Sequence, residues 1–115
     1  MADIIGEVNN SESFEKILTE RTRLNVLIYA SWCPFCRTFI PIFRQHAERN
    51  PWLFLMLQDD EEKMATQYGV NIYPSVLYFE NGSITKRLDG IPGKGLQEEQ
   101  FALFIDDLAM QGARS

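Results

Sequence analysis

The residues of this chain best suited to chemistry are its two cysteines, Cys33 and Cys36, which are separated by only two residues in the segment SWCPFCR at positions 31–37. A structural zinc site takes about four Cys or His ligands, and two cysteines with one histidine do not supply them. A disulfide that spans two residues closes almost no loop in the unfolded chain, so it stabilises little. The spacing therefore favours a dithiol that can open and close over a pair of inert buried thiols.

The elements around the cysteines are those that would activate one of them. An apolar, β-rich run over residues 24–30 predicts a buried central strand, and helical spacing of apolar residues then continues to Asn50-Pro51. Cys33 can therefore cap the helix, with Pro34 in its first turn. Free amides and the helix dipole favour a thiolate there, so we assign Cys33 as the nucleophile. Cys36, one turn deeper on the same side, is assigned as the resolving thiol.

The rest of the chain alternates between helical and strand patterns, which predicts an α/β layout with a mixed sheet. We expect a helix from residue 11 or 13 to 19, a strand over 52–57, a short helix over 61–68, a hairpin over 74–88, a loop over 90–95 and a closing helix over 96–111. At 115 residues, 45% of them hydrophobic, the chain is long enough for one core and too short for two. Residues 1–115 are therefore expected to form a single domain.

Charge and hydropathy exclude several classes of partner. The net charge is −5, and no cluster of Lys and Arg suits phosphate contacts, so nucleic-acid binding is not expected. No apolar run approaches the roughly 20 residues of a membrane span, and the first ten residues do not resemble a secretion signal. We therefore expect a cytoplasmic location, where a CxxC pair is more often catalytic than structural.

Several separated motifs resemble the thioredoxin family, and the resemblance covers nearly the whole chain. WCPFC at 32–36 resembles the family's WCxxC active site, and Pro41 matches the proline of the following helix. The stretch YGVNIYPSVLYFENG places the family's cis-proline at Pro74, and DGIPG places its glycine-containing loop at Gly90. The resemblance implies a thioredoxin fold, with a mixed sheet flanked by helices. It also implies thiol-disulfide oxidoreductase activity on protein disulfides with no bound cofactor.

The same resemblance, together with the aromatic residues near the cysteines, predicts a groove for substrates. Its predicted substrate-binding residues are Trp32, Pro34, Phe35, Tyr73, Pro74 and Gly90. A cis-proline would turn the backbone of residue 73 toward the cysteines, where it can pair with an extended peptide. Tyr73 replaces a residue that is usually smaller or aliphatic. Its ring could narrow the groove, stack on a substrate, or simply be an exposed ring beside a turn. Aromatic rims suit peptide recognition, although Trp32 could also simply cover the end of the strand.

Two departures from the family concern proton transfer and the direction of electron flow. Leu27 stands six residues before Cys33, where thioredoxins carry a buried aspartate, and Leu55 and Met56 lie near the position of its partner lysine. The proton relay for the resolving cysteine is therefore absent. Another carboxylate could substitute only if the fold brings one near, and the three candidates are expected to be solvated surface charges instead: Asp59, Asp60 and Glu80. The CPFC motif also differs from the typical CGPC, which leaves a more oxidising role open.

The leading hypothesis is a monomeric protein that reduces disulfides in protein substrates and receives electrons from a separate reductase. One alternative is a binding module that presents Trp32, Tyr73 and Pro74 to a peptide and has little redox activity. A second is a more oxidising disulfide oxidase or isomerase. A third is a pair of subunits whose CxxC motifs share a metal ion or an iron-sulfur cluster.

Overall fold

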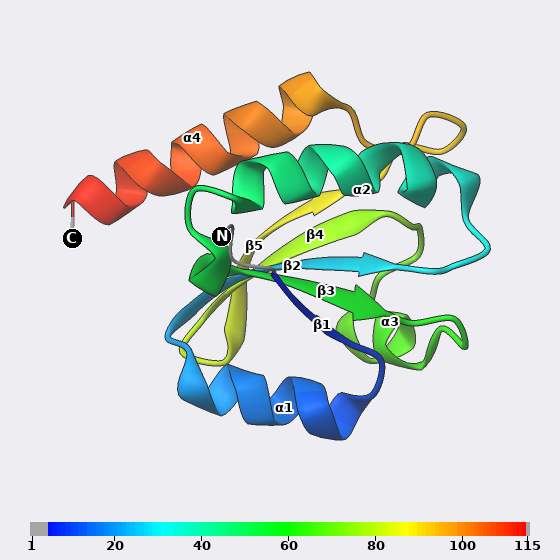
Figure 1. Cartoon of the computed structure of the whole chain (residues 1–115), viewed down its shortest axis with the longest axis horizontal. Coiled ribbons are helices and arrows are strands. Elements are labelled where there is room, and N and C mark those ends of the chain that lie inside the picture. The colour runs from blue at the N-terminus through cyan, green and yellow to red at the C-terminus, as the bar shows by residue number, and fades with distance from the viewer. Residues whose placement is uncertain (1–4, 115) are drawn as a thin grey trace.

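A five-stranded mixed sheet forms the centre of the computed structural model, which describes residues 5–114 (Figure 1). Its strands are β1 (Gly6–Val8), β2 (Arg23–Tyr29), β3 (Phe54–Gln58), β4 (Ser75–Glu80) and β5 (Ser83–Asp89), in the spatial order β1-β3-β2-β4-β5. β1 and β2 run parallel to β3, whereas β4 is antiparallel to both β2 and β5. The predicted α/β fold with a mixed sheet is confirmed.

Helices cover both faces of this sheet. They are α1 (Ser11–Glu20), α2 (Pro34–Ala47), α3 (Lys63–Tyr68) and α4 (Glu98–Arg114). α2 and α4 lie on one face, and α1 and α3 lie on the other (Figure 1). One aromatic cluster joins α1, α3 and β4 through Phe14, Tyr68 and Phe79, and another joins α2 to α4 through Phe39, Phe43 and Phe101. Burial on both faces explains the continuous apolar run of β2.

The structure corrects the predicted elements mainly at their boundaries. The strand expected over 52–57 begins only at Phe54, because Pro51–Leu53 form a 3₁₀ turn. Trp52 in that turn is exposed, and the Arg21 guanidinium lies 4.1 Å from its ring centroid. β1 was not expected, since three residues are too few to show strand alternation. The last two helices begin two residues later than predicted, at residues 63 and 98.

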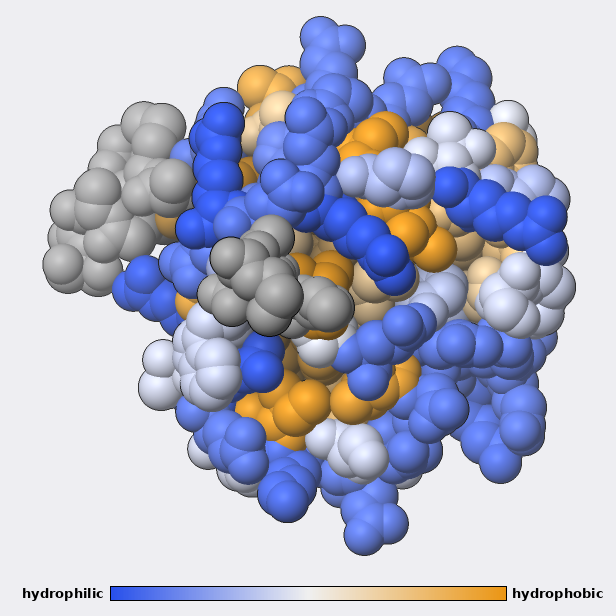
Figure 2. All heavy atoms as spheres, viewed as in Figure 1, coloured by the Kyte–Doolittle hydropathy of each residue, from blue (hydrophilic) through white to orange (hydrophobic). Residues whose placement is uncertain are grey.

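The surface carries charged and polar side chains between small apolar areas. In the view of Figure 2, hydrophilic residues predominate and hydrophobic residues form several separate patches. Within residues 5–114, no helix is both long and apolar enough to cross a membrane.

Candidate functional site

Cys33 lies where β2 has ended and α2 begins, and it is the N-cap residue of α2. Its Sγ accepts a hydrogen bond from the backbone N–H of Cys36 at 3.3 Å. Pro34 occupies the first turn, where its missing N–H leaves no helical hydrogen bond unmade. Both cysteines are free thiols. The Cys33 sulfur therefore lies at the amino-terminal end of α2, beside a backbone amide of the first turn.

The two thiols differ in their access to solvent. Cys36 is fully buried, and desolvation raises the pKa of its thiol to about 12, with a contribution from its hydrogen bond with Cys33. Cys33 is only 4% exposed. The rings of Trp32 and Tyr73, which line a surface groove, pack against each other with centroids 5.7 Å apart. Cys33 lines the same groove, and Cys36 does not. A reagent in the groove therefore meets Cys33 first.

The groove has a volume of about 300 Å³ and brings together most of the predicted substrate-binding residues. Trp32, Pro34, Phe35 and Tyr73 line it beside Cys33, and the Trp32 side chain is 55% exposed. Sequence reasoning missed five further lining residues: Glu62, Ala65, Val70, Asn71 and Ile72. The last three directly precede Tyr73, so their position could have been inferred. The other two come from the beginning of α3, which no sequence signal placed near the cysteines.

Pro74 and Gly90 are buried next to the groove and do not line it. The Tyr73–Pro74 peptide bond is cis, as the family resemblance implies. A Cβ on Gly90 would lie 2.5 Å from the carbonyl oxygen of Pro74, so this approach requires glycine. Gly95, with φ of +70°, approaches Phe35 in a similar way, since a Cβ there would lie 2.7 Å from the Phe35 Cβ. The 90–95 loop therefore packs against Pro74, next to the groove, and against Phe35, which lines it.

Tyr73 is not an exposed ring beside a turn: its side chain is buried and lines the groove, and stacking of the ring on a substrate stays a prediction. It is 8% exposed and packs against Trp32. Its main-chain oxygen lies 3.7 Å from Cys33 Sγ, which donates to it. Its hydroxyl donates to Asp59, whose Oδ2 and main-chain O both lie 2.8 Å away. Asp59 therefore holds the ring in place, and sequence analysis did not identify it as a partner of Tyr73.

Asp59 was expected to be a solvated surface charge, but it is buried, with 3% exposure. Its carboxylate accepts hydrogen bonds from the backbone amides of Met64 at 3.1 Å and Ala65 at 2.7 Å, at the beginning of α3. A carboxylate between a buried strand and a helix commonly caps that helix. This signal was present in the sequence and could have identified Asp59.

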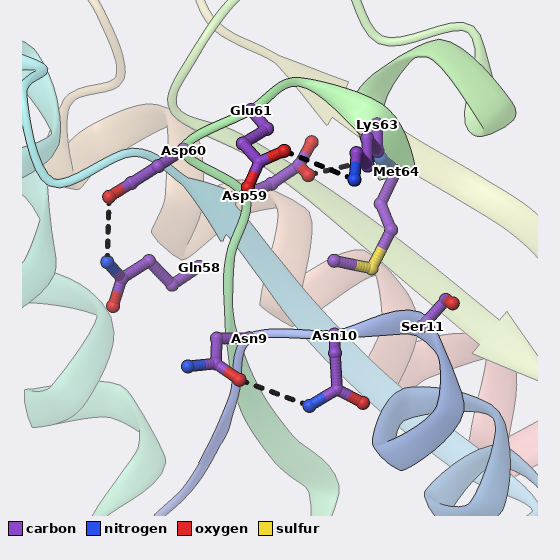
Figure 3. A pocket seen from close by; sticks show the side chains of 9 residues that line it. All are labelled: Asn9, Asn10, Ser11, Gln58, Asp59, Asp60, Glu61, Lys63 and Met64. Atoms are coloured by element: carbon purple, nitrogen blue, oxygen red, sulfur yellow. Dashed lines mark hydrogen bonds and ion pairs between the residues drawn. The ribbon is translucent and has the colours of Figure 1, made fainter.

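Asp60 is exposed as predicted, but it also binds the segment in front of Cys33. Its carboxylate accepts hydrogen bonds from the backbone N–H and the hydroxyl of Ser31, both at 2.7 Å, and these bonds lower its pKa. Its carbonyl oxygen accepts a hydrogen bond from Trp32 Nε1 at 3.2 Å. Figure 3 shows the side chains of Asp59 and Asp60 on opposite sides of the β3–α3 loop. This loop therefore contacts both the cysteine segment and Tyr73.

No carboxylate replaces the missing relay among the side chains that the structure describes. Leu27 is fully buried in β2, in register with Met56 of β3 and Val76 of β4. Glu80 lies at the end of β4 farthest from Pro74, and Asp59 is bound to Tyr73 and α3. The proton of Cys36 therefore has no carboxylate acceptor within hydrogen-bonding distance in this part of the molecule.

Known proteins resemble this chain in sequence and in fold. The thioredoxin family model matches residues 6–106. The thioredoxin of Mycoplasmoides gallisepticum is 28% identical over 94 residues, which cover 79% of this chain and 94% of that protein. The H-type thioredoxin of Oryza sativa subsp. indica is 28% identical over 100 residues, or 82% of each chain.

Solved structures of thioredoxins share the fold of this chain. The thioredoxin of Malassezia sympodialis has a TM-score of 0.76 at 14% identity and covers 93% of each chain. A reduced thioredoxin pre-protein of Schistosoma mansoni also has a TM-score of 0.76, at 19% identity, and covers 91% of this chain and 98% of its own. At these identities the structures support the fold alone. The family match is independent of them and spans most of the sequence, cysteines included, so this chain belongs to the thioredoxin family.

Proposed function

We propose that this protein reduces disulfide bonds in other proteins through a Cys33/Cys36 dithiol-disulfide cycle. The observation that carries the proposal is the asymmetry of the two thiols. Cys33 lines the groove and accepts the amide hydrogen bond of Cys36, whereas the Cys36 thiol is fully buried behind it. This arrangement supplies an attacking sulfur and a protected resolving sulfur.

The cycle proceeds by two thiol-disulfide exchanges. The Cys33 thiolate attacks one sulfur of a substrate disulfide, that S–S bond breaks, and a mixed disulfide forms as the first substrate thiolate leaves. Cys36 then loses its proton and attacks Cys33 Sγ, and the second substrate thiolate leaves and takes up a proton. The substrate has gained two electrons, and Cys33 and Cys36 have become a disulfide. A separate reductase, supplying two electrons, returns the protein to the dithiol.

The groove would select extended polypeptide segments. The exposed rings of Trp32 and Phe35 offer apolar contact to substrate side chains, and the main chain of Tyr73 lies beside Cys33, where it can pair with a substrate backbone. Pro34 lines the groove, while Pro74 and Gly90 support its wall. Action as a single-domain monomer in the cytoplasm remains a prediction.

Reduction of insulin by dithiothreitol tests this function. The wild-type protein is expected to accelerate precipitation of the freed B chain, and Cys33→Ser is expected to give the rate of dithiothreitol alone. A peptide-binding module with inert cysteines would not accelerate the reaction. A wild-type rate equal to the dithiothreitol background would therefore contradict the proposed function.

A further inference from the structure

The main chain of Tyr73 lies beside the nucleophile, Cys33. Its carbonyl oxygen lies 3.7 Å from Cys33 Sγ. A shift of about 1 Å at this residue would change both the environment of the sulfur and the alignment of a bound peptide. Whatever fixes Tyr73 therefore controls how a substrate disulfide is presented to Cys33.

The side chain of Tyr73 is held in place by a hydrogen bond as well as by packing. The side chain is buried, and its hydroxyl lies 2.8 Å from Asp59 Oδ2. Burial, with a smaller contribution from this hydrogen bond, raises the pKa of Tyr73, so the hydroxyl keeps its proton and acts as the donor. A phenylalanine ring would fill the same space without that bond. The hydrogen bond to Asp59 therefore fixes the orientation of the Tyr73 side chain more tightly than packing of the ring alone would.

Asp59 is a fixed acceptor because its other hydrogen bonds are already made within the fold. Its carboxylate receives the amides of Met64 and Ala65 as well as the Tyr73 hydroxyl, so this buried charge has three donors. Its own backbone N–H donates to the carbonyl of Tyr29, the last residue of β2, at 2.8 Å. Asp59 therefore links Tyr73, whose main chain lies beside Cys33, to the end of β2 and to the beginning of α3.

We propose that Asp59 and the Tyr73 hydroxyl form a buried anchor that positions the main chain of Tyr73 for substrate binding at Cys33. Asp59 is a positioning residue, since its described hydrogen bonds do not include either cysteine and it acts through Tyr73. The inference rests on the proposed function, because it assigns the anchor a role in binding a disulfide substrate. It predicts an effect on substrate affinity that a purely structural hydrogen bond would not produce.

Tyr73→Phe tests the anchor, with Tyr78→Phe as the matched control. Both tyrosines are 8% exposed, but the Tyr78 hydroxyl has no hydrogen bond among the described residues. The assay is steady-state reduction of a short peptide disulfide, with dithiothreitol as the electron donor. We expect KM to rise about tenfold in Tyr73→Phe, the size of losing one hydrogen bond to a charged acceptor, with kcat nearly unchanged. Tyr78→Phe is expected to keep the wild-type KM.

A second variant, Asp59→Asn, tests the other half of the anchor. It retains an oxygen acceptor and removes the charge, so we expect a smaller rise in KM in the same direction. A wild-type KM in Tyr73→Phe, an equal rise in Tyr78→Phe, or an unchanged KM in Asp59→Asn would overturn the anchor while wild-type activity leaves the proposed function standing. An inactive wild-type protein would instead contradict the proposed function, and the anchor with it.

Discussion

Cys36→Ser is expected to accumulate covalent mixed disulfides with protein substrates, whereas Cys33→Ser is expected to trap none. In Cys36→Ser the groove-lining sulfur of Cys33 still attacks, but serine cannot displace the bound substrate, so turnover falls to background. In Cys33→Ser the remaining thiol is fully buried and does not line the groove. Mass spectrometry of each variant after incubation with disulfide-bonded insulin measures the amount of mixed disulfide.

The comparison of the two variants tests the assignment of the two roles. Equal trapping by both would show that the fold does not distinguish the thiols. Preferential trapping by Cys33→Ser would reverse the roles and contradict the burial of Cys36. Wild-type protein is the control, because it releases its substrate and accumulates little adduct.

Leu27→Asp is expected to destabilise the protein strongly and yet to speed the release step near pH 7. The side chain is fully buried in the central strand β2, so a carboxyl group there should lower the free energy of unfolding by at least about 3 kcal/mol. The same carboxyl group stands where thioredoxins carry their buried aspartate, and it would accept the proton of Cys36. Stopped-flow measurement of the resolution of a Cys33 mixed disulfide gives the rate.

Two measurements distinguish the possible causes of faster release in Leu27→Asp, which are proton transfer to the new carboxylate and loosening of the core. They are the pH dependence of release and the release rate of a second variant. Only the thiolate of Cys36 attacks, and burial raises the pKa of this thiol to about 12. Wild-type release should therefore quicken with rising pH, by about tenfold per unit, well below that pKa. Leu27→Asn matches the shape and polarity of Leu27→Asp without a basic carboxylate, and it should not accelerate release. Equal rates in the two variants would show that proton removal from Cys36 is not limiting.

Local sequence patterns predict those parts of the structure that depend on neighbouring residues. The N-cap position of Cys33 follows from a strand, a Cys-Pro pair and a helix in immediate succession, and the structure has this geometry. The Asn81-Gly82 turn likewise identifies the hairpin of β4 and β5. The strand expected at Trp52 is wrong because a proline in front of an apolar run favoured a 3₁₀ turn that hydropathy alone does not reveal.

The parts of the site that local patterns did not predict are contacts between distant segments. Asp59 and Tyr73 are 14 residues apart and meet because β3 and β4 flank β2 in the sheet. The two acidic residues after β3 look alike in sequence, but one is buried beneath Tyr73 and the other is exposed beside Ser31. The beginning of α3 reaches the groove for the same reason, since the β3–α3 loop returns toward the cysteines.

The measurement that tests the central claim most directly is a redox titration of the purified protein in glutathione buffers, with acid quenching and mass-spectrometric counting of free thiols. A reversible dithiol cycle predicts that Cys33 and Cys36 lose both thiols in one two-electron transition, as an intramolecular disulfide without bound glutathione. The midpoint potential also distinguishes a reductant from an oxidase. Oxidation of one thiol alone, persistent glutathione adducts, or two free thiols in fully oxidising buffer would contradict the account.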